Sequence, residues 1–178
     1  MKNGLTVIAM LGLAAFVGCA EESSSTTAAP AKTSTAPSVD GSKFIITEEP
    51  EGAKDVIAVR EAAKDGDDVV LVGRIGGSEN PWIEGQAAFT VVDNSLQACN
   101  AIEGDTCKKP WDYCCETSKL PGATALVKVV DENGDSVKAD ARDLLHVTEL
   151  SRIIVKGKAV RDDAGNLTVL ATGIYVKK

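Results

Sequence analysis

The chain has 178 residues, and its 26 acidic side chains outnumber its 19 lysines and arginines, which gives a formal net charge of −7. Proteins that bind nucleic acid usually carry a basic excess, because contacts with phosphate supply most of their affinity. The charge therefore argues against a nucleic-acid partner. A single histidine, His146, excludes catalytic sets that need two imidazoles within one chain. We expect one folded domain.

The N-terminus carries a short apolar run. Thr6 is the only polar residue between positions 5 and 17, and Lys2 precedes the run. It is shorter than the roughly 20 residues that span a bilayer, but it has the length of a secretory signal segment. The alternative is a buried helix that ends in Gly-Cys. Gly18-Cys19 resembles the lipobox of bacterial lipoproteins, which implies cleavage after residue 18 and attachment of a lipid to the Cys19 thiol.

The segment after Cys19 has little that could be buried. Residues 20–43 hold 6 Ser, 4 Thr, 5 Ala and 2 Pro. Such a composition cannot offset the conformational entropy of ordering, so we predict a disordered tether over residues 19–43. With a signal peptide over residues 1–18, this predicts an extracytoplasmic protein. It would be lipid-anchored to a bacterial cell membrane or outer membrane, on the periplasmic side or at the surface.

Residues 44–178 are the predicted folded domain, and a helical pattern comes first. We expect a helix over residues 55–64, because Val56 and Val59 would fall on one face. Asp55 stands where its side chain could cap the start of that helix.

Apolar stretches after this helix predict five β-strands, at residues 69–75, 87–93, 125–130, 152–161 and 167–176. Asn133-Gly134 predicts a turn, with residues 137–140 pairing back, and residues 142–150 predict one or two helical turns. The order β-β-β-α-β-β is that of the OB-fold. The predicted fold is therefore mostly β: a five-stranded OB-fold-like barrel with a short N-terminal helix and a Cys-rich loop insertion. Another small β-sandwich or barrel is the alternative.

A family resemblance covers residues 53–178 apart from the loop at 94–122. It is carried by the stretches at residues 56–64, 67–75, 89–93 and 154–160. Together they resemble the bacterial OB-fold family of small periplasmic proteins and, more loosely, the tRNA-anticodon-type OB domains. The resemblance implies a binding or stress-related module without catalysis. We expect its partner to be an unidentified protein or small molecule.

The insertion at residues 94–122 is far longer than a connection between neighbouring strands requires. It carries four cysteines, Cys99, Cys107, Cys114 and Cys115. In an oxidising compartment two disulfides are the first interpretation, with Cys114 and Cys115 each reaching back to an earlier cysteine. The second is a thiolate site for zinc or copper, although the C-x7-C-x6-C-C spacing lacks the C-x2-C pairs of common zinc sites. A reactive or redox-active thiol is the third. Under the disulfide interpretation no cofactor is expected.

Three aromatic side chains are candidates for ligand binding. Trp82 lies between the first two strands, and Trp111 and Tyr113 lie in the insertion. Each could stack on a ligand, but buried aromatic residues belong mostly to the core, so packing is the alternative. In a simple antiparallel barrel the Trp82 loop and the insertion leave from opposite ends, which predicts two separate surfaces.

Overall fold

The computed structural model describes residues 39–178. The predicted signal peptide, Cys19 and the tether up to residue 38 lie outside the described residues. The first described element is η1 (Gly41–Phe44), a 3-10 helix that buries Phe44 in the main core.

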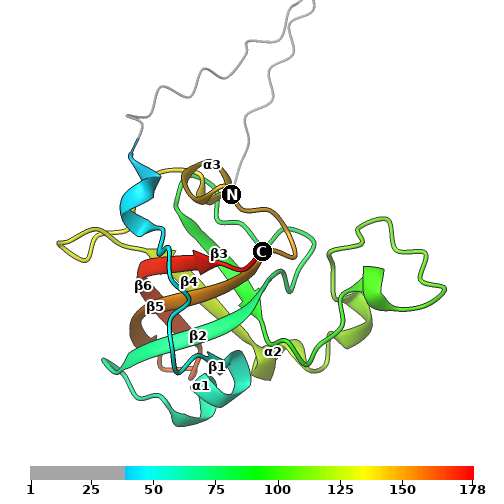
Figure 1. Cartoon of the computed structure of the whole chain (residues 1–178). Helices are drawn as coiled ribbons and strands as arrows, with labels where there is room; N and C mark the ends of the chain where they lie inside the picture. Colours follow the sequence, from blue (N-terminus) through cyan, green and yellow to red (C-terminus); the bar gives the residue numbers. More distant parts are fainter. Residues whose placement is uncertain (1–38) are drawn as a thin grey trace, which may run out of the picture. The chain divides into compact units, whose positions relative to one another are not determined.

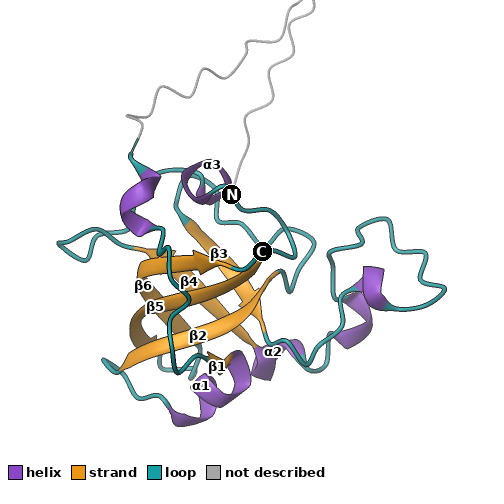
Figure 2. Ribbon diagram, viewed as in Figure 1, coloured by secondary structure: helices purple, strands orange, loops and turns teal. Residues whose placement is uncertain are grey.

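Five strands close into a barrel: β2 (Asp68–Ile75), β3 (Ala88–Val92), β4 (Thr124–Val129), β5 (Arg152–Arg161) and β6 (Leu167–Val176). They are hydrogen-bonded in the order β2-β3-β4-β6-β5, and β2 also pairs with β5, which closes the ring (Figures 1 and 2). Within the ring, β4 and β6 run parallel and the other pairs are antiparallel. The predicted OB-fold-like barrel is confirmed.

A sixth strand, β1 (Lys54–Asp55), was not expected from the sequence. It pairs parallel with β2, with Lys54 opposite Leu71. This edge of β2 is open there because β3 pairs only with Arg74 and Ile75 at the end of β2. The remaining short elements are α1 (Val56–Ala62), η2 (Cys99–Ala101), η3 (Cys114–Glu116), α2 (Leu120–Ala123) and α3 (Ala141–Leu145).

The predicted strand bounds lie within one residue of the observed ones. The turn at Asn133-Gly134 is present, with Gly134 at a φ of 86°. The stretch 137–140, however, forms no strand, and the hairpin is limited to one bridge between Val130 and Ser136. The Val137 backbone bonds to Ala87 and Val129 instead, and Asp140 then caps α3.

The barrel interior is filled by alternate residues of the five strands, such as Leu71, Phe89, Val127, Val155 and Val169, all with 0% exposure. This alternation is what a half-buried sheet requires. The strand β5 bends over β6 at a bulge between Lys156 and Gly157. A Cβ at position 157 would lie 2.1 Å from the Leu170 carbonyl oxygen, so this bend needs glycine.

Asp93 joins α1, the barrel and the start of the insertion. Although it is only 3% exposed, its carboxylate accepts hydrogen bonds from the Ile57 amide (2.7 Å) and from the Ser95 amide and hydroxyl (2.9 and 2.7 Å). It thereby caps α1, a role the sequence had suggested for Asp55, whose carboxylate instead accepts from the Asn94 side chain. Burial alone would raise the pKa of Asp93, but these hydrogen bonds favour the charged form and hold its pKa below the usual range.

We predict that Asp93→Asn lowers the free energy of unfolding by about 2 kcal/mol, because charged hydrogen bonds are lost in a buried site. Since the folded pKa is depressed, the stabilisation is present above the ordinary carboxyl pKa of about 4 and is lost as the pH falls through the folded value. Urea unfolding at pH 7 and at pH 3 measures this. Asp163→Asn, in an exposed turn, is the control, and equal stability of the two variants at pH 7 would contradict the assignment.

Candidate metal centre

The Cys-rich insertion leaves the barrel after β3 and returns to it at β4, and in Figure 1 it stands off one side of the barrel, in shades of green. Two backbone hydrogen bonds pair its outgoing and returning halves. The Cys99 amide donates to the Asp112 carbonyl (2.8 Å), and the Asn100 amide donates to the Pro110 carbonyl (2.9 Å). This pairing brings Cys99 beside the residues that follow Asp112.

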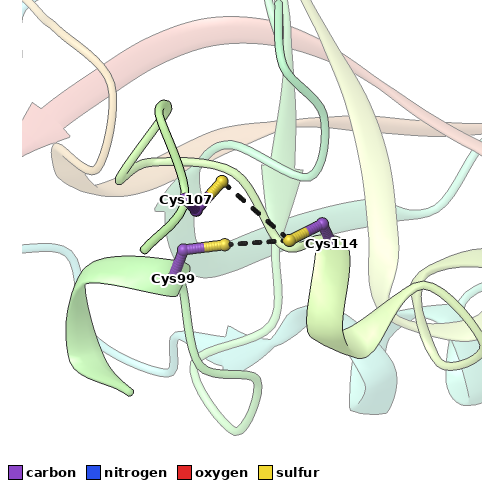
Figure 3. A group of neighbouring side chains, drawn as sticks. All are labelled: Cys99, Cys107 and Cys114. Atoms are coloured by element: carbon purple, nitrogen blue, oxygen red, sulfur yellow. Dashed lines mark hydrogen bonds between the residues drawn. The ribbon is translucent and has the colours of Figure 1, made fainter. Parts of the chain in front are cut away.

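Three of the four cysteines converge. The Sγ atoms of Cys99 and Cys114 are 3.3 Å apart, and those of Cys114 and Cys107 are 4.0 Å apart. All three sulfur atoms lie within 4.8 Å of one another, as Figure 3 shows. Cys115 is exposed and is not part of this group. The predicted disulfides of Cys114 and Cys115 with an earlier cysteine are not shown, although Cys114 does lie beside Cys99 and Cys107. We call Cys99, Cys107 and Cys114 the thiol triad.

The triad runs from the interior to the surface. Cys99 has 0% exposure, Cys107 is half-buried, and Cys114 is exposed. Burial raises the pKa of the Cys99 thiol, and its hydrogen bond with Cys114 raises it further. For Cys114 the hydrogen bond with Cys99 lowers the pKa, but desolvation and the thiols of Cys107 and Cys115 outweigh it, so the net shift is upward.

These raised pKa values argue against the interpretation that the cysteines are reactive or redox-active thiols. A nucleophilic or redox-active cysteine is activated by a depressed pKa, the opposite of what Cys99 and Cys114 show. Of the two lysines that follow Cys107, Lys108 and Lys109, the second forms an ion pair with Glu79. The cysteines of the insertion are all free thiols in this structure.

A small apolar cluster fixes the base of the insertion to the barrel. This insertion core consists of Val92, Leu96, Ala98, Tyr113 and Ala123. Tyr113 is its largest member and has 0% exposure. Its ring lies against the backbone of Gly76, where a Cβ would stand 2.7 Å from Tyr113 Cε2. Because Tyr113 immediately precedes Cys114, its packing also places one member of the triad.

The insertion contacts the loop between β2 and β3, which corrects the expectation that the two lie at opposite ends of the barrel. Trp111 donates a hydrogen bond from Nε1 to the Glu79 carbonyl (3.1 Å), and Lys109 pairs with the Glu79 side chain. The reason is that β2 ends beside the end of β3, with Arg74 opposite Val92 and Ile75 opposite Val91. The β2–β3 loop and the insertion therefore begin close together.

The aromatic candidates are differently exposed. Trp82 is 8% exposed and belongs to the main core, where its ring meets Phe89 edge-on at a centroid distance of 5.8 Å. Its Nε1 donates to Glu149 (2.7 Å), and the Arg142 guanidinium lies 5.5 Å from its ring centroid. Trp82 and Tyr113 therefore act in packing, and of the three candidates Trp111 keeps the most accessible ring.

A groove large enough for a small molecule lies elsewhere on the barrel. It crosses β2, β5 and β6 and has a volume of about 550 Å³. Its lining includes Val70, Leu170 and the exposed Lys156 and Lys158, and none of the three aromatic candidates. Lys158 is already paired with Asp68 at 2.9 Å.

Among residues 39–178, no helix is both long and apolar enough to cross a membrane.

No protein-family model matches the sequence, and no curated protein matches it. Among solved structures, the chain is similar to the hypothetical protein ygiW from E. coli, with a TM-score of 0.37 and 12% identity over 75% of this chain and 96% of that one. It is also similar to a putative aspartyl-tRNA synthetase from Leishmania major Friedlin, with a TM-score of 0.38 and 5% identity over 75% of this chain and 22% of that one. Likenesses this weak carry no functional argument, and membership of the small periplasmic family stays a prediction.

We predict that Gly76→Ala displaces Tyr113 and loosens the insertion, with a loss of about 1–3 kcal/mol in the free energy of unfolding from overpacking. Alkylation of Cys99 by iodoacetamide, followed by peptide mass spectrometry, should become faster because this thiol loses its cover. Gly122→Ala is the matched control, since a Cβ there meets nothing within 4 Å. Unchanged Cys99 protection in Gly76→Ala would show that Tyr113 does not hold the insertion in place.

Proposed function

We propose that this chain is a lipid-anchored extracytoplasmic protein whose OB-fold-like barrel carries a binding site rather than a catalytic one, and that its ligand is one soft metal ion. The ion would be held by the thiol triad of the insertion. The observation that carries the proposal is the convergence of three sulfur atoms within 4.8 Å.

The sulfur separations support a shared ion better than a disulfide. Thiolates bound to one ion at about 2.3 Å and at tetrahedral or trigonal angles lie about 3.8–4.0 Å from one another. The 4.0 Å separation of Cys114 and Cys107 lies in that range, and the 3.3 Å separation of Cys99 and Cys114 is about 0.5 Å shorter. A disulfide joins two sulfurs at about 2.05 Å and leaves the third outside.

The donor set limits the metal. Within residues 39–178, the group contains no imidazole and no carboxylate. Sites made only of thiolates favour Cu(I) or Zn(II) over calcium, magnesium and manganese, which prefer oxygen donors. The insertion core and the contacts with Gly76 and Glu79 fix the base of the loop, which reduces the entropy lost when the ion binds.

The anchor is supported by the sequence. The apolar run at residues 5–17 and Gly18-Cys19 have the order of a lipoprotein signal, and residues 20–43 have the composition of a tether. Two or three acyl chains on Cys19 would hold the protein stably at a membrane, whereas one would hold it weakly.

We predict that radiolabelled palmitate is incorporated into the full chain expressed in a bacterial host, and that Cys19→Ser abolishes the labelling and retains residues 1–18. The variant Ser25→Ala, within the tether, should be labelled like the wild type. An unlabelled wild-type chain recovered from the cytosol with its first 18 residues attached would overturn the anchor.

For the metal, we predict that the reduced full chain with Cys19→Ser binds one equivalent of Cu(I) or Zn(II), and that Cys99→Ser abolishes this binding while Gly122→Ala does not. A cysteine binds a metal ion as the thiolate, so each thiol of the triad must give up its proton on binding. The ion must displace these protons, so its apparent affinity should rise with pH. Equilibrium dialysis at pH 6 and pH 8 measures both effects.

The disulfide interpretation gives the opposite result. Protein isolated from the cell envelope without reductant would then have a mass about 4 Da below that of the all-thiol chain, from two disulfides. Such a mass, together with a failure of the reduced chain to bind either ion, would overturn the metal proposal.

A further inference from the structure

We infer that the resident ion is Cu(I), bound by Cys99, Cys107 and Cys114, and that Cys115 is an exchange ligand through which the copper passes to an external thiol. This inference rests on the proposed metal site and names its ion and its exchange partner. It is drawn from the number of converging sulfurs, the gradient of exposure across them and the position of the fourth cysteine.

The number of donors favours copper over zinc. A structural zinc site is almost always four-coordinate, so it would need a fourth protein ligand. The triad supplies three sulfurs, and no fourth His, Cys, Asp or Glu atom of residues 39–178 joins the group. Cu(I) is a soft ion that is satisfied by three thiolates in a plane, and soft thiolate sites select it.

The exposure of the donors is one-sided. Cys99 has 0% exposure and anchors the inner side, whereas Cys114 lies at the surface. An ion held between them is covered by protein on the Cys99 side and faces solvent on the Cys114 side. Ligand exchange therefore has a defined entrance, where an incoming sulfur can approach without unfolding the insertion.

Cys115 stands at this entrance. It follows Cys114 directly in the 3-10 helix η3 and is itself exposed, like Cys114. A fourth thiol beside an exposed donor but outside the coordinating group has no role in holding the ion in place. It can take over the copper from Cys114 and present it one residue further outward.

The exchange step balances without a redox reagent. As the bond between copper and the Cys114 sulfur breaks, a bond to the Cys115 sulfur forms. The Cys115 thiol gives up its proton, and the departing Cys114 thiolate takes one up. A second exchange of the same kind moves the ion from the protein to an external thiol. Copper stays in the +1 state throughout, and no electron is transferred.

The test uses the full chain with Cys19→Ser, reduced and loaded with one Cu(I), with glutathione as the external thiol. Affinity is measured by competition with bicinchoninate, and transfer by the rate at which glutathione removes the copper. Cys114→Ser should lower the affinity by roughly 100-fold, because a direct ligand is lost. Cys115→Ser should leave the affinity within about twofold and slow the transfer by about tenfold, since only the exchanging sulfur is removed.

Two controls keep the outcomes separate. Ser118→Ala, an exposed change in the same segment, should alter neither affinity nor transfer, and circular dichroism should show the barrel intact in every variant. If Cys115→Ser weakens binding as much as Cys114→Ser, or transfers copper at the wild-type rate, the inference is wrong. Zinc held by four sulfurs that include Cys115 would also overturn it while leaving the proposed metal site in place. Binding of neither ion would remove the proposed function itself.

Discussion

The packing of Tyr113 on the backbone of Gly76 is the contact on which the Cys-rich insertion depends. The ring is fully buried, and it can approach this closely only because position 76 has no side chain. It ties a loop with little core of its own to the end of β2 and sets the position of Cys114, the next residue. Together with the contacts of Trp111 and Lys109 with Glu79, it holds the backbone pairing of Cys99 with Asp112 against the barrel.

The barrel was predictable from the sequence because its strands carry local signals. β5 and β6 were predicted at their observed bounds, since both are long stretches rich in apolar residues and a clear turn at residues 162–166 separates them. Contacts between distant segments left no such signal. The pairing of β1 with β2 depends on how far β3 extends, and the cap of α1 comes from Asp93, 36 positions beyond the amide that it binds. The nearby Asp55 was the local candidate, and it bonds elsewhere.

The site was only partly predictable. The sequence singled out the four cysteines, but their spacing does not say which three converge. That choice is made by two long-range features, the pairing of residues 99–100 with 110–112 and the burial of Tyr113. The same features explain why the insertion meets the β2–β3 loop instead of leaving from the opposite end. In the sequence, Tyr113 directly before two cysteines and Gly76 directly after an apolar strand are the signals that could have indicated the packing of the insertion on the β2–β3 loop.

The protein therefore combines a rigid barrel, a loop packed against it and a thiol triad that is buried on the Cys99 side and exposed on the Cys114 side. X-ray absorption spectroscopy of the reduced full chain with Cys19→Ser, loaded with one Cu(I), tests the proposed copper site most directly. We predict that the copper is coordinated by three sulfur atoms at about 2.3 Å and by no nitrogen or oxygen donor. A shell dominated by oxygen or nitrogen, or by two sulfurs alone, would contradict it.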